Sequence, residues 1–123
     1  MIKIADNTVC IAGGTSDYGS YRCHSSSEVL DVMATERVWK RGPSLHTARE
    51  RSMSWSFQDA TGNWWGLVGG GRTGTWNPYH LEYLDSVEIY DGTQEKAKFV
   101  RAPVFQLPHV VAGAGAAVLP PEN

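Results

Sequence analysis

The sequence predicts an all-β fold, and three observations lead to that prediction. The chain has 123 residues, among them 13 glycines and six prolines, and no segment has the apolar spacing of a helix. Short apolar runs at residues 9–12 and 65–68 lead into glycine, which is typical of strands covered on both faces. Between Ser52 and Phe57, serine alternates with larger apolar residues, as in a strand with two unequal faces.

One pattern occurs twice along the chain. An apolar strand with a glycine pair is followed by a polar loop, a second apolar strand and an aromatic-x-Arg-small-Pro signature. The glycine pairs at 13–14 and 69–70 lie 56 residues apart, and the signatures at 39–43 and 99–103 lie 60 residues apart. A repeat of this period indicates supersecondary units that bury their faces against one another.

The strands follow in order from this pattern. Strands are predicted at residues 9–12, 28–32, 52–57, 65–68 and 87–90. Residues 59–63 supply hairpin chemistry through Asp, Gly and Asn. Residues 112–119 occupy the place of 52–57 one repeat later. Segments 15–27 and 72–85 are expected to be long loops at one end of the fold, because they join the same pair of strands in successive copies.

This ordered set resembles a kelch repeat, and residues 84–91 (LDSVEIYD) are its most similar segment. The resemblance covers roughly residues 8–119. The family that the chain resembles includes galactose-oxidase-like and kelch-like proteins. It implies a β-propeller whose blades each have four antiparallel strands. On this basis residues 1–123 are one kelch-repeat region: 8–57 hold the first repeat from its second strand, and 58–119 hold the second repeat plus the first strand of a third.

The expected number of blades is too small for a closed ring. A propeller usually has about four to eight blades, whereas this chain holds about two. Two interpretations follow. Either the chain is a piece of a longer kelch protein, which is the preferred one, or several copies assemble to close the ring. In both cases an isolated chain would expose apolar blade faces and sheet edges.

Composition and charge argue against some classes of binding partner. A net charge of −2 gives no general attraction to nucleic acid or to an anionic membrane. No apolar run reaches the length of about 18 residues that a membrane helix needs, and the first seven residues are too short and polar for a secretory signal. Cys10 and Cys23 make no disulfide framework. We therefore predict a cytoplasmic protein with free thiols and with neither nucleic acid nor membrane as partner.

Several chemical sites are disfavoured by their surroundings. Residues 69–74 match G-x-G-x-x-G, but a dinucleotide site needs a helix after them, and the Asn77-Pro78 sequence there does not permit one. The four histidines have no ligand spacing, and Ser44 lacks the final glycine of a nucleophile elbow. We predict no catalytic residue, no metal and no cofactor.

The candidate binding residues are aromatic residues and arginines in the two long loops, together with arginines before the strand at 52–57. Such side chains dominate protein–protein interfaces, although the loops could equally pack on each other. The candidates are Tyr18, Tyr21, Arg22, Arg49, Arg51, Arg72, Trp76 and Tyr79.

Arg49 matches an arginine that many kelch repeats carry before their first strand, and the resemblance implies that this position faces the ligand-binding end of the ring. The next repeat has His109 at the place assigned as equivalent. A contact from Arg49 or Arg51 to an acidic partner predicts that Arg49→Ala weakens binding without unfolding the chain.

The leading functional prediction is a protein–protein interaction module that presents loops to another protein. The alternative from the resemblance is a piece of a kelch-propeller enzyme acting on carbohydrate, similar to galactose oxidase or to sialic-acid mutarotase. Tyr21, Cys23 and His24 are residue types that a copper oxidase uses, but their spacing fits no motif. A truncated product without activity is a third interpretation.

Overall fold

The computed structural model describes residues 1–16, 22–75, 79–93, 96–102, 106–113 and 115. Within these residues every regular element is a β-strand, which confirms the all-β prediction. No helix of the length and hydrophobicity needed to cross a membrane occurs in this part of the chain. The first sheet consists of β1 (Ile2–Ala5), β2 (Thr8–Ala12), β3 (Ser27–Asp31) and β4 (Lys40–Arg41). The second sheet consists of β5 (Met53–Gln58), β6 (Trp64–Gly69), β9 (Val87–Asp91) and β10 (Lys98–Arg101).

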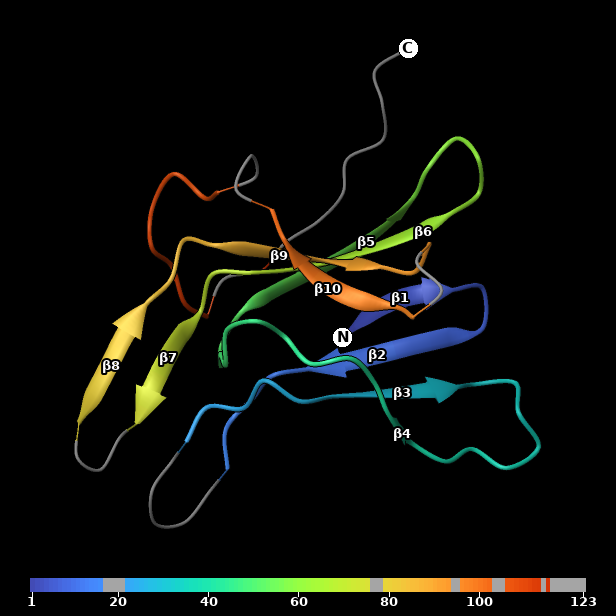
Figure 1. The fold of residues 1–123 in the computed structure, drawn as a ribbon, viewed down its shortest axis with the longest axis horizontal. Helices are drawn as coiled ribbons and strands as arrows, with labels where there is room; N and C mark the ends of the chain where they lie inside the picture. Colours follow the sequence, from blue (N-terminus) through green and yellow to red (C-terminus); the bar gives the residue numbers. More distant parts are fainter. Residues whose placement is uncertain (17–21, 76–78, 94–95, 103–105, 114, 116–123) are drawn as a thin grey trace.

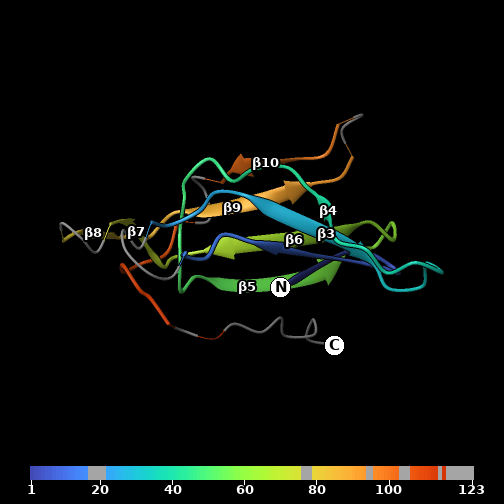
Figure 2. The same cartoon turned by 90° about the horizontal axis from the view of Figure 1, so that it is seen from below.

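Both sheets are antiparallel and have the same topology. The first has the order β1-β2-β3-β4, and the second, read from its first strand, has the order β5-β6-β9-β10. The second sheet differs because a separate hairpin, β7 (Arg72–Thr75) with β8 (His80–Tyr83), lies between its middle strands in sequence. In both views this hairpin extends from one end of the molecule, opposite the β5–β6 turn and the β3–β4 connection (Figures 1 and 2).

Two regions differ from the sequence prediction. No strand was predicted before residue 9, yet β1 pairs with β2 and completes the first sheet. Its four residues are too few to give a clear alternation, and the strand is recognised by the burial of Ile2 against Gly66 of the second sheet. The segment 72–85 was predicted as a loop, whereas its ends pair as β7 and β8 with Arg72 opposite Tyr83. The strand predicted at 112–119 lies mostly outside the described residues.

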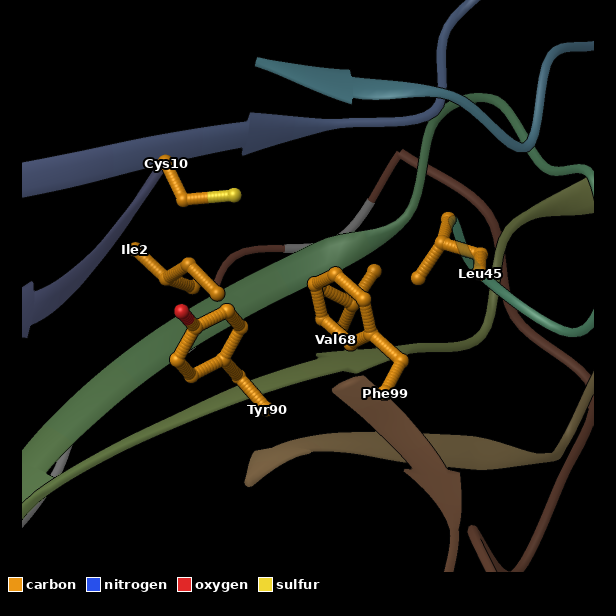
Figure 3. Packing of buried hydrophobic residues seen from close by; sticks show 6 residues of the cluster. All are labelled: Ile2, Cys10, Leu45, Val68, Tyr90 and Phe99. Carbon is orange, nitrogen blue, oxygen red and sulfur yellow. The ribbon is translucent and has the colours of Figure 1, made fainter. Parts of the chain in front are cut away.

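The core lies between the two sheets (Figure 3). Strand alternation directs one face of each sheet inward. The rings of Tyr90 and Phe99 meet edge to face, with centroids 5.6 Å apart, a favourable arrangement for aromatic pairs. The buried cluster comprises Ile2, Cys10, Leu45, Val68, Tyr90 and Phe99.

Hydrogen bonding corrects the alignment of the two repeats. The amide of Gly13 donates to the Ser26 carbonyl, and the amide of Gly70 donates in the same way to Ser86. The structural equivalent of the pair 13–14 is therefore 70–71 rather than 69–70. All four of these glycines have positive φ, a conformation that glycine adopts without a steric penalty, whereas Gly69 belongs to β6.

The connections that follow the sheets are also offset. The amides of Leu45 and Leu107 donate to the Ser25 and Asp85 carbonyls, respectively. The amides of Gly14 and Gly71 bond to the carbonyls of Arg49 and Val111. Val111, not His109, is therefore the counterpart of Arg49, because the second connection is two residues longer than the first.

Candidate functional site

Residues 42–49, which we call the strap, lead from the first sheet to the second. The backbone of the strap belongs to the first sheet: the amides of Gly42 and Leu45 donate to the carbonyls of Ser27 and Ser25. At the end of the strap, the Arg49 amide donates to the His24 carbonyl at 3.1 Å. These bonds hold the strap along the end of the first sheet.

The strap reaches the second sheet through a buried carboxylate on β9. Glu88 accepts hydrogen bonds from the backbone amides of His46, to Oε1 at 2.6 Å, and Thr47, to Oε2 at 3.2 Å. The Arg49 guanidinium donates to the same carboxylate, with 2.8 Å between Nη2 and Oε2. Both side chains of this ion pair are essentially without solvent exposure. A buried carboxylate of this kind is stable only when such partners surround it.

Further hydrogen bonds fix the Arg49 side chain. Nη1 donates to the carbonyl oxygens of Gly70 and Ser86, and Nη2 donates to the Ser86 hydroxyl. Arg49 is among the most buried residues of the described chain. The structure therefore places this predicted partner-binding residue in the interior, where it joins the two sheets.

A second buried ion pair lies at the base of the β7–β8 hairpin. Arg72 Nε donates to Glu50 Oε1 at 2.6 Å, and the backbones of the same two residues exchange hydrogen bonds of 2.9 and 3.0 Å. Burial disfavours the charge of Arg72, but the hydrogen bonds and charges of Glu50 and Tyr83 outweigh it, so that the pKa of Arg72 is raised. Arg72 was also predicted to bind a partner, but it is only 8% exposed and supports the hairpin instead.

The loops of the two repeats meet side by side. Arg22 pairs with Thr75 of β7, and Thr15 pairs with Cys23, both in antiparallel bridges. The Cys23 amide donates to the Gly74 carbonyl at 3.3 Å. Gly74 has a φ of 114°, and a Cβ there would overlap the His80 carbonyl. Glycine is therefore required at this position for β7 to lie so close to β8.

Three exposed side chains of this region form what we call the hairpin surface: Arg22, Tyr79 and Tyr83. Tyr79 is 62% exposed and Tyr83 is 45% exposed. Arg22 and Tyr79 were predicted from the sequence. Arg51 is also exposed, but it belongs to the segment leading into β5 and has a φ of 51°. The predicted residues Tyr18, Tyr21 and Trp76 lie outside the described residues.

The thiol nearest the hairpin surface is held in its neutral form. Burial and the charge of Glu50 raise the pKa of Cys23, against the opposing effects of Arg72 and the Gly74 backbone. Cys23 Sγ lies 3.7 Å from the Arg72 carbonyl, to which it donates. A higher pKa lowers the fraction of the thiol that is present as the reactive thiolate. Among the described residues, no three His, Cys, Asp or Glu side chains converge as a metal site requires.

Sequence reasoning missed three residues of this region as site residues. Glu88 lies between the apolar residues Val87 and Ile89 of β9, and a charge at such a position indicates a buried partner. Glu50 directly follows Arg49 in the sequence. Tyr83 is in the long loop but was not chosen. No family model matches this chain, and no curated protein matches it.

Proposed function

We propose that this chain forms two blades of a kelch-type β-propeller and serves as a protein–protein interaction module, with the hairpin surface as its binding site. The repeated order of four antiparallel strands in each sheet supports the first part. The strap, which joins the last strand of one sheet to the first strand of the next, is the connection such an architecture requires. A module of this kind presents loops on a rigid scaffold.

The observation that carries the proposal is the lateral pairing of the two loops. Because Arg22 pairs with Thr75, the segment before β3 and the β7–β8 hairpin form one continuous surface rather than two separate loops. Tyrosine and arginine contribute most of the binding energy in typical interfaces, and a rigid base lowers the entropy lost on binding. The Glu50–Arg72 ion pair and its backbone bonds supply that base.

The test compares three forms of the immobilised chain. Tyr79→Ala combined with Tyr83→Ala removes the exposed aromatic groups, and Thr61→Ala, in the exposed β5–β6 turn at the opposite end, is the matched control. A protein that binds the wild-type chain is purified. Its dissociation constant is then measured with the wild-type chain, the double variant and the control. We expect affinity to fall about 30-fold or more for the double variant, which corresponds to loss of roughly 2 kcal/mol. Equal affinity for all three forms would reject the hairpin surface as the binding site.

A further inference from the structure

The second sheet has an apolar face that turns away from the first sheet. Ser54, Ser56, Gly66 and Val68 face inward, because they contact or hydrogen-bond Met1 or β1, or belong to the core. By strand alternation the intervening residues face outward. They line a shallow hollow of about 190 Å³, and its residues are Trp55, Phe57, Trp65, Leu67 and Ile89. We call this the aromatic face.

Strand register relates the aromatic face to the contact inside the molecule. In the first sheet Ile2 lies opposite Cys10, which lies opposite Val29. In the second sheet Trp55 lies opposite Leu67, which lies opposite Ile89. The aromatic face therefore occupies, in its own sheet, the positions with which the first sheet packs against the second.

The outer face of the first sheet occupies the same strand positions as the inner face of the second sheet, since Ile11 pairs with Glu28 as Val68 pairs with Glu88. Ile11 and Trp39 are 37% and 38% exposed, whereas their equivalents Val68 and Phe99 are almost fully buried. A second copy could in principle place this outer face on the aromatic face of the first. Whether two copies can pack in this way depends on the side chains that would come into contact.

Volume argues against a second copy. Inside the molecule Ile2 packs against Gly66, where even a Cβ would come within 2.5 Å of the isoleucine Cδ1. In the contact between copies Trp55 would replace Ile2, and Val9 would replace Gly66, since Ser56 pairs with Gly66 as Lys3 pairs with Val9. Both side chains are larger, and overpacking of this kind is destabilising.

Charge argues the same way. Inside the molecule the strap brings Arg49 to Glu88. Between copies the counterpart of Glu88 is Glu28, since Glu28 pairs with Arg41 as Glu88 pairs with Arg101. The counterpart of Arg49 is Val111, which has no charge to offer. A buried Glu28 would lack its guanidinium, which is strongly unfavourable.

We propose that the aromatic face binds an antiparallel β-sheet of different sequence, with glycine or another small residue opposite Trp55 and no carboxylate opposite Val111. The continuity with the inner contact fixes this chemistry: the partner has the small inner-face residues of the second sheet but not its buried glutamate. The aromatic face is separate from the hairpin surface, and this proposal does not depend on partner binding there.

The test uses the chain itself as a probe. Val9→Gly gives the first sheet the small residue that the proposal requires, and Glu28→Gln in the same chain removes the uncompensated carboxylate. Sedimentation velocity over a range of concentrations reports association, and far-ultraviolet circular dichroism confirms folding. Val9→Ala with Glu28→Gln is the milder variant if the glycine form does not fold. We expect the wild-type chain to remain monomeric and the probe to associate at least about tenfold more tightly.

Two controls locate the contact. Trp55→Ser added to the probe is expected to abolish association, and Trp55→Ile added to it, which restores the inner Ile–Gly pair, is expected to strengthen it. Association of the wild-type chain as tight as that of the probe would overturn the proposal and make a second copy the occupant. A folded probe that stays monomeric, or one that associates regardless of Trp55, would also overturn it.

Discussion

Two connecting segments of this chain make matching hydrogen bonds to their own sheets but end in different side chains: residues 42–49 in the first, and the described residues 102 and 106–111 in the second. Both donate backbone hydrogen bonds to residues just before the third strand of their sheet, Leu45 to Ser25 and Leu107 to Asp85. Only the first carries an arginine into a neighbouring sheet, where Glu88 receives it. The second carries Val111 at the same place. The backbone hydrogen bonds of the described residues are therefore repeated, whereas the side chain at this position is not.

Removing the arginine should have the largest effect. Arg49→Ala leaves Glu88 buried with only backbone donors, and we expect the free energy of unfolding to fall by about 3–5 kcal/mol. Urea denaturation followed by tryptophan fluorescence measures this change. Val111→Ala is the control in the second segment and should cost less than about 1 kcal/mol. A loss below that value for Arg49→Ala would mean that the ion pair does not hold the sheets together.

The aromatic residue of the repeated signature offers a second comparison. Phe99 is buried against Tyr90, whereas Trp39, its equivalent, is 38% exposed. Phe99→Ala should lower the stability by about 3–4 kcal/mol through the cavity it leaves, and Trp39→Ala by less than about 1 kcal/mol. Thermal unfolding of both variants measures the difference. Similar losses would show that the outer face of the first sheet is covered in solution.

The smallest expected effect concerns the β5–β6 turn. Hydrogen bonds from the Trp65 indole, then from Thr61 and Asn63, lower the pKa of Asp59 to about 2. Because the folded pKa is depressed, the stabilisation is present above the ordinary value of 3.8 and is lost as pH falls toward about 2. The first sheet has Thr8 at the position of Trp65. We expect Trp65→Phe to raise the pKa of Asp59, as measured by carboxyl chemical shifts, and an unchanged titration would contradict this cause.

The sequence predicts the all-β class and most strands of the second sheet, because apolar runs and glycine turns are local signals. It does not predict β1, whose burial depends on Ile2 fitting against Gly66, a residue distant in sequence. For the same reason Arg49 was assigned to the surface. Its partner is 39 residues away, and an arginine in a polar segment has the same local pattern whether it faces solvent or a buried glutamate. Arg22 and Tyr79, which were chosen as binding candidates, are exposed, and their role in binding stays a prediction.

The strap has a consequence for how the chain unfolds. Some of its backbone amides donate to carbonyls of the first sheet and of the segment before β3. The amides of His46 and Thr47 and the Arg49 guanidinium instead donate to Glu88 of the second sheet. If either sheet detaches, Glu88 loses hydrogen-bond donors that the strap supplies. Partly opened forms therefore have a high free energy. Amide hydrogen exchange should then show His46, Thr47 and Arg49 opening together with the strands of both sheets, as one cooperative unit.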